Sequence, residues 1–104
     1  MNINNQQEIY RAKVNLETAQ IAWKELQRFF ASGAAVQVSE ELDLVEVAFQ
    51  MSQDNAGQIQ QWMREGKMDK VTDEQAAAWY ETDALVWAVV VSPYVLVQAS
   101  GTLH

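Results

Sequence analysis

The sequence lacks cysteine altogether and has a single histidine, His104, at its last position. Disulfides, thiolate metal ligands and cysteine nucleophiles are therefore excluded. A lone histidine at a chain terminus is also poorly placed to serve in a catalytic triad. The four glycines stand far apart, at positions 33, 57, 66 and 101, so the chain has no glycine-rich phosphate loop. These absences predict a protein without catalytic, cofactor-binding or metal-binding residues.

Apolar segments long enough for a membrane are missing as well. The first residues, MNINNQQEIYRAK, contain no apolar stretch of the kind found in signal peptides, so we expect a cytoplasmic protein. The most apolar run extends for fourteen residues, from Ala84 to Val97, and contains Pro93. A helix needs about 20 apolar residues to cross a bilayer. The run is therefore predicted to form buried strands, and we expect no membrane partner.

Basic residues are scarce in the second part of the chain. Residues 1–33 hold four basic and three acidic side chains, whereas residues 34–104 hold three basic and eleven acidic ones, which gives a net charge of −7. Such a charge repels nucleic-acid phosphates and anionic lipids, so we expect neither as a partner. It would attract a cation or a basic protein surface. The alternative is that the acidity only keeps a small protein soluble.

What the sequence does contain is the composition of a globular protein, with 49% hydrophobic and 20% charged residues. Its 104 residues predict a single domain over residues 1–104, with frayed ends at about 1–4 and 100–104.

Periodic apolar spacing predicts five helices. They cover residues 4–17, the second half of 18–33, 39–53, 54–66 and 73–81. Thr72 and Gln75 have the Thr-x-x-Gln spacing of a capping box in front of the last helix. The helix at 39–53 has two alternative starts. One is at the acidic pair Glu40 and Glu41, and the later one is at Asp43.

Shorter segments predict strands at residues 34–38 and 67–71. In the first of these, Val36 and Val38 are expected to face one way and Gln37 the other, because side chains alternate along a strand.

The apolar C-terminal run is predicted to form a hairpin of Trp87–Val91 with Val95–Gln98. Proline cannot adopt the positive φ of the usual two-residue hairpin turns, so we expect a type I turn with Ser92 first and Pro93 second. The alternative is one long edge strand with a bulge at Pro93.

Together these elements predict an α+β fold, with about five helices packed on one face of a small three- to four-stranded sheet that ends in a C-terminal strand pair. The residues expected in its core are Leu16, Leu26, Phe29, Val36, Val38, Val45, Ala48, Ile59, Trp62, Val89, Val91, Val95 and Val97.

Four tryptophans are many for a chain of this length. In the helix at 54–66, Trp62 shares the inward stripe with Ile59 and Met63 and is expected to fill the core. Aromatic side chains also dominate interface hot spots and bind cations. The candidates for a partner- or ligand-binding surface are Trp79, Tyr80, Trp87 and Tyr94.

Carboxylates are the one abundant reactive group, and four of them crowd residues 40–46. The segment lacks the spaced Asp-x-Asp-x-Asp-Gly pattern of a calcium loop, so we expect a solvated helix start. Paired carboxylates that cleave glycosidic bonds would have to face each other across a cleft. The sequence leaves that alternative open.

Three segments, TAQIAWKELQRFFASG, LDLVEVA and WAVVVSPYVLVQ, resemble in order and spacing a family of small bacterial proteins known as domain of unknown function 2288. The resemblance extends over nearly the whole chain. It implies a bacterial, intracellular, single-domain protein, and it brings no activity, cofactor or active-site residue.

Three functions follow as hypotheses. The first is a small acidic protein-interaction or regulatory module without catalytic activity, which binds a protein partner or itself through a sheet edge or the aromatic surface. The second is a binder of a cationic or amphipathic small molecule, which predicts a pocket that combines Trp79 or Trp87 with an acidic side chain. The third is an enzyme that works through carboxylates, with or without Mg²⁺, and it predicts two buried carboxylates in one cleft. We expect the first.

Overall fold

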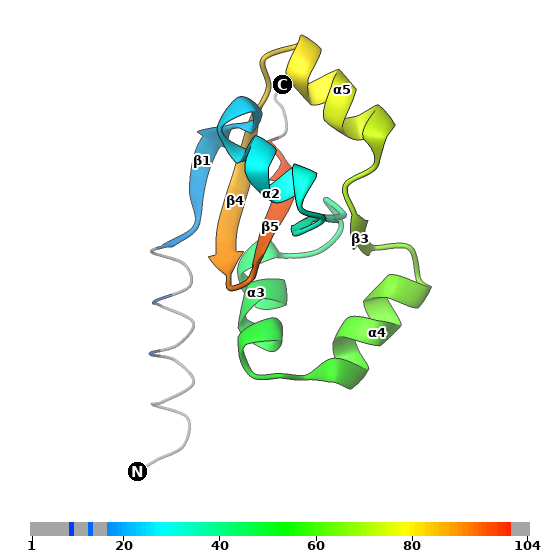
Figure 1. Ribbon diagram of the computed structural model, residues 1–104. Coiled ribbons are helices and arrows are strands. Elements are labelled where there is room, and N and C mark those ends of the chain that lie inside the picture. Colours follow the sequence, from blue (N-terminus) through cyan, green and yellow to red (C-terminus); the bar gives the residue numbers. More distant parts are fainter. Residues whose placement is uncertain (1–8, 10–12, 14–16, 101–104) are drawn as a thin grey trace.

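A five-stranded mixed sheet lies at the centre of the protein (Figure 1). The structure is a computed structural model, and it describes residues 9, 13 and 17–100. The helix predicted at residues 4–17 therefore falls almost entirely outside the described residues. The elements are β1 (Ala19–Ala22), the 3-10 helix η1 (Trp23–Leu26), α2 (Gln27–Ala31), β2 (Ala35–Val38), α3 (Leu44–Ser52), α4 (Ala56–Arg64), β3 (Met68–Lys70), α5 (Asp73–Glu81), β4 (Leu85–Val91) and β5 (Tyr94–Ala99).

The strands lie in the order β1-β4-β5-β2-β3. The central strand, β5, pairs antiparallel with β4 and parallel with β2, and each edge strand pairs antiparallel with its inner neighbour. The α+β class is as predicted, but the sheet has five strands rather than three or four. The additional strand is β1, whose four residues, AQIA, include two alanines and carry little strand propensity.

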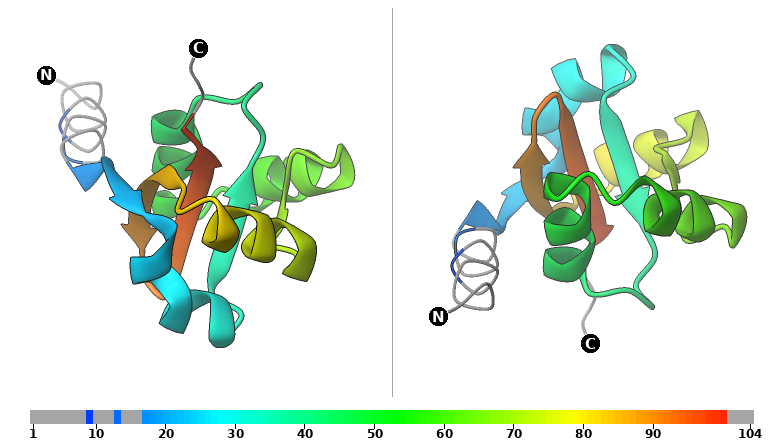
Figure 2. Two further views of the ribbon diagram at one scale, coloured as in Figure 1. Left: turned by 90° about the horizontal axis from the view of Figure 1, so that it is seen from above. Right: turned by 90° about the horizontal axis from the view of Figure 1, so that it is seen from below.

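Helices cover both faces of the sheet, so the prediction that they pack on one face is wrong (Figure 2). On the first face, η1, α2 and α5 pack over Val86 and Val97; this is called the α5 face. On the second, α3 and α4 pack over Val89 and Leu96; this is called the α3 face. The physical reason lies in β4 and β5, whose consecutive apolar residues need cover on both sides.

Local signals at the helix starts are confirmed. The side chain of Thr72 accepts a hydrogen bond from the backbone N–H of Gln75 at 3.0 Å and caps α5. The later of the two alternative starts holds for α3, because Asp43 accepts from the backbone N–H of Val45 at 2.9 Å. Side-chain caps of this kind satisfy backbone donors that the helix itself leaves unpaired.

The C-terminal run forms the predicted hairpin, with Val91 opposite Tyr94 across a two-residue loop. The expected type I turn is wrong. The Ser92–Pro93 peptide bond is cis, and a cis proline at the third position is the mark of a type VI turn. No described helix is long and apolar enough to cross a bilayer.

The predicted core is confirmed in most positions. Leu26, Val38, Ala48, Val89, Val95 and Val97 are buried, and Phe29, Val36, Val45, Ile59, Trp62 and Val91 pack against them partly buried. Leu16 lies outside the described residues. Met63 is 50% exposed rather than inward, because α4 lies beside the β3 edge and the sheet covers only part of its apolar stripe. The prediction omitted Trp23, which is fully buried between α2 and α5.

Candidate functional site

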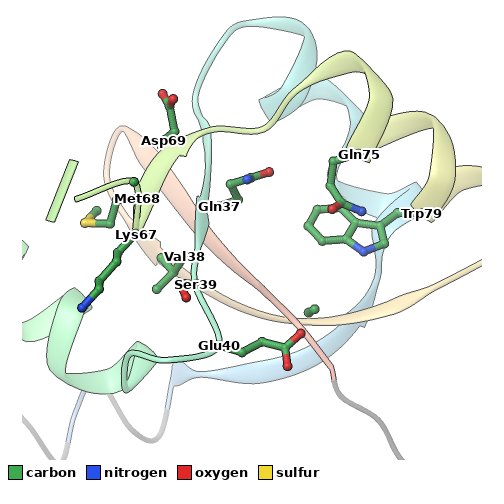
Figure 3. A pocket seen from close by; sticks show the side chains of 11 residues that line it. Gln37, Val38, Ser39, Glu40, Lys67, Met68, Asp69, Gln75 and Trp79 are labelled. Atoms are coloured by element: carbon green, nitrogen blue, oxygen red, sulfur yellow. The ribbon is translucent and has the colours of Figure 1, made fainter. Parts of the chain in front are cut away.

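A pocket of about 220 Å³ opens on the α5 face, between α5 and the part of the sheet formed by β2 and β3 (Figure 3). Its floor comes from β2, its wall from α5, and its rim from the turns that follow β2 and precede β3. The lining residues are Gln37, Val38, Ser39, Glu40, Gly66, Lys67, Met68, Asp69, Gln75, Trp79 and Ala99.

Strand alternation places the polar floor of the pocket. Val36 and Val38 face the same side of the sheet, as predicted, and that side is the α3 face, so Gln37 between them faces α5. Its strand partners are Asp69 of β3 and Val97 of β5. Asp69 lies on the same face as Gln37, because residues directly opposite each other share a face.

The wall of the pocket is one stripe of α5. Gln75 and Trp79 are four residues apart and therefore project from the same side of the helix. The indole of Trp79 also packs against Trp23, with ring centroids 5.0 Å apart. This contact with a fully buried side chain fixes the orientation of the Trp79 ring beside the pocket.

The side-chain oxygen of Gln37, Oε1, is buried and accepts no hydrogen bond from the described residues. In Figure 3 the Gln37 side chain extends toward Gln75 and Trp79. Another glutamine of the sheet, by contrast, has hydrogen-bond partners for its side chain. Gln98, on the α3 face of β5, donates from Nε2 to the carbonyl oxygens of Ser39 and Leu42 at 2.9 and 2.7 Å. An unpartnered buried acceptor costs roughly 1–3 kcal/mol, so it needs a compensating role.

The charges around the pocket are predominantly negative. Glu40 and Asp69 contribute carboxylates, and Lys67 is the one cationic side chain among the described residues that lines it. The Lys67 ammonium forms ion pairs with Glu41 at 3.7 Å and Glu65 at 3.6 Å, and Figure 3 shows it directed away from Gln75 and Trp79. Its charge is thus compensated by two acids outside the pocket.

Glu65 has a lowered pKa. The main cause is a hydrogen bond from the side chain of Gln61 at 3.1 Å, and the positive charge of Lys67 adds to it. Both interactions favour the ionised carboxylate. No group of three His, Cys, Asp or Glu side chains able to hold a metal ion occurs among the described residues.

The structure distributes the four candidate aromatic residues over separate places. Trp79 lines the pocket, and Tyr80, 51% exposed, has the Lys24 ammonium 5.0 Å from its ring centroid. Trp87 lies on the α3 face, two residues from Val89. Tyr94 borders a more apolar pocket between the β4–β5 turn and the connection from α3 to α4. They do not form one continuous surface.

Sequence reasoning did not single out Gln37 or Gln75 as site residues. The available signal was the position of Gln37, which is a polar residue inside an apolar strand and predicted to face away from the two valines. A glutamine at such a position is equally compatible with a strand surface that faces solvent. The sequence alone therefore did not show whether the Gln37 side chain lines a pocket or is exposed to water.

A profile of the family described as protein of unknown function (DUF2288) matches residues 9–99. The chain belongs to this family. Among solved structures, the NMR solution structure of PA1075 from Pseudomonas aeruginosa is 41% identical to this family member, with a TM-score of 0.78. The match covers 100% of this chain and 99% of that one. No curated protein matches the chain significantly. Membership confirms the resemblance indicated by the three sequence segments, and the family description states no activity.

Proposed function

We propose that the protein binds a small ligand carrying positive charge and hydrogen-bond donors in the pocket between α5 and the β2–β3 part of the sheet. The observation that carries the proposal is the buried Gln37 Oε1, an acceptor without a donor among the described residues, on a side chain that lines the same pocket as Trp79. The pocket combines Trp79 with Glu40 and Asp69, which is the combination that the small-molecule hypothesis requires.

Three properties narrow the ligand class. The orphan oxygen selects an N–H or O–H donor, and the carboxylates of Glu40 and Asp69 favour a cation. The Trp79 ring adds a cation–π or stacking surface. The volume of about 220 Å³ is below the range of about 300–1,000 Å³ typical of pockets for drug-sized ligands. We therefore infer a small amine, amidine or guanidinium compound.

The proposal is tested by NMR titration of the isotope-labelled full chain with methylguanidinium and short-chain diamines, with neutral amides of equal size as the comparison. We expect saturable shifts of the Gln37 side-chain amide and the Trp79 indole N–H with the cations only. Gln37→Leu should abolish the shift of the Trp79 indole N–H, the reporter that both proteins share. Gln53→Leu, which removes an exposed glutamine remote from the pocket, should leave both shifts unchanged. Equal binding by the two variants would refute the site.

A protein-interaction role is the second candidate, and a different region supports it. Leu85 and Trp87 expose 53% and 40% of their surface on the α3 face, away from the pocket. A carboxylate-based enzyme has no comparable support, because every aspartate and glutamate that the structure describes is at least partly exposed. Two buried carboxylates in one cleft would be its structural sign.

A further inference from the structure

Among the residues that the structure describes, no strand pairs with the outer side of β1. Within residues 17–100, β1 pairs with β4 on one side, and its other side is an outer edge of the sheet. The strand reads AQIA, without a charge or a proline. Natural proteins usually protect such edges with charged side chains, proline, a bulge or a covering element, because free backbone N–H and C=O groups are a template for pairing.

Exposed apolar side chains flank β1 on both faces of the sheet. On the α3 face, Leu85 lies opposite Ala22 and Trp87 opposite Gln20. On the α5 face, Val90 is 55% exposed and borders an apolar hollow that includes Ala19 and Ile21. An added strand would therefore bring apolar contacts above and below the sheet as well as backbone hydrogen bonds.

We propose that β1 pairs antiparallel with β1 of a second copy of this chain, and that Leu85 and Trp87 of both copies complete the interface. Charge favours a second copy at this edge. The chain carries a net charge of −7, so two copies repel each other over most of their surfaces. Residues 17–33 are balanced, with Lys24 and Arg28 against Glu17 and Glu25. This region is where two like-charged molecules can approach with the least repulsion.

The geometry of a two-fold axis is compatible with β1. An axis perpendicular to the sheet keeps equivalent faces on the same side. It allows registers in which Gln20 lies opposite Gln20 of the second copy, or Ile21 opposite Ile21 of the second copy, since residues directly opposite must share a face. Either register continues the sheet from one molecule into the other.

The flanking side chains are required because the strand is short. A stable interface buries about 800 Å² on each partner, and a four-residue strand alone supplies less. Tryptophan, the residue at position 87, is among the residue types most enriched in interface hot spots. Leu85, more exposed than Trp87, extends the apolar area on the same face.

The test is sedimentation equilibrium of the full chain from about 10 μM to about 1 mM, the range that detects weak dissociation constants. We expect a mass that rises from 11.8 kDa toward twice that value. Leu85→Lys should raise the dissociation constant about tenfold or more. The matched control is Met63→Lys on α4, since Met63 is 50% and Leu85 53% exposed, and it should have no effect. A monomer throughout, or equal effects of both variants, overturns the proposal.

Two further measurements distinguish loss of strand pairing from misfolding of the variant and from association through another surface. If Leu85→Lys perturbs folding by circular dichroism, Gln20→Lys places a charge on the strand itself and should give the same loss of association. In a mixture of labelled and unlabelled protein, intermolecular NOEs between β1 residues of the two copies are expected. A dimer without them, or contacts from residues 1–16 to the β1 edge within one copy, would contradict strand pairing.

Discussion

The two edge strands of the sheet differ in charge and in what surrounds them. The β1 edge is uncharged and flanked by exposed leucine, tryptophan and valine. The β3 edge has three residues, MDK, and two of them are charged. There the carboxylate of Asp69 accepts a hydrogen bond from the backbone N–H of Lys70 at 2.8 Å, which occupies a donor of the strand. One sheet thus has an edge suited to pairing with protein and an edge that resists pairing and borders a polar pocket.

Each edge strand is next to a helix that carries one tryptophan, and the two tryptophans should contribute unequally to stability. Trp23 follows β1 and is fully buried, whereas Trp62 precedes β3 and is partly exposed. Trp23→Ala is expected to lower the free energy of unfolding by about 3–5 kcal/mol. Trp62→Ala should cost less, because less apolar area leaves water on folding. Urea denaturation measures the free energy of unfolding of both variants. Equal losses would show that Trp23, near the β1 edge, and Trp62, near the β3 edge, stabilise the fold equally.

The two glutamines on opposite faces should respond to the same substitution with opposite sign. Gln98→Leu leaves the carbonyl oxygens of Ser39 and Leu42 without their donor, and it should destabilise the fold by about 1–3 kcal/mol. Gln37→Leu removes an acceptor that has no donor, and it should stabilise the protein by about 1 kcal/mol.

Chemical denaturation of both variants, without added ligand, measures the two values. Because both changes replace glutamine by leucine in an inner strand, differences in strand propensity largely cancel. A loss of stability in Gln37→Leu equal to that in Gln98→Leu would mean that the Gln37 side chain contributes to the fold. Gln37 would then have a structural role, and its unpartnered acceptor would not indicate a ligand.

A substitution in β3 should make its edge, like that of β1, prone to pairing with other chains. Asp69→Val frees the backbone N–H of Lys70 and removes a charge, so β3 should gain a tendency to pair with other chains. We expect an increase in association of about tenfold, equivalent to about 1.4 kcal/mol. Asp69→Asn is the matched control. It keeps a side-chain acceptor and loses only the charge, so its effect should be smaller. Light scattering at matched concentrations distinguishes these variants from the parent.

The smallest expected effect concerns Glu65, near the entry to β3. Its pKa is lowered mainly by the hydrogen bond from Gln61. A carboxyl whose pKa is lower in the folded state adds stability above its ordinary pKa, and that stability is lost as the pH falls through the folded-state pKa. Gln61→Ala should return the pKa toward its ordinary value. A carboxyl-detected NMR titration measures both proteins, and no difference between them would assign the lowering to Lys67 instead.

Strand and helix positions were predictable where a local signal is strong. The capping box at Thr72 predicted one helix start, Asp43 was one of two alternatives for another, and the valines of the C-terminal run indicated the hairpin. The strand at β1 was not predictable, because four weakly strand-forming residues become a strand only through pairing with β4, far along the chain. The second covered face was missed for a related reason. Apolar residues at consecutive positions show that both faces are buried, but the segments covering each face are set by chain topology.

The candidate site was predictable only in part. A ligand pocket was expected to combine Trp79 or Trp87 with an acidic side chain, and Glu40 and Asp69 line the same pocket as Trp79. The other three aromatic candidates do not line this pocket. Tyr80 is adjacent to Trp79 in sequence, and adjacent residues project in different directions from a helix. Gln37 enters the site through its pairing with β3 and β5, which local sequence does not reveal.

The position of β5 has a consequence for how the chain reaches its native state. In the sheet, β5 joins the β1–β4 pair to the β2–β3 pair, and it follows all four of them in the sequence. During synthesis, the strands on both sides are therefore made before the one that unites them. Pairing between strands as far apart in the sequence as β2 and β5 slows folding, because the entropy of the intervening loop is lost before the contacts form. Until β5 emerges, a nascent chain holds two incomplete half-sheets with apolar surfaces that only the last strand can bring together.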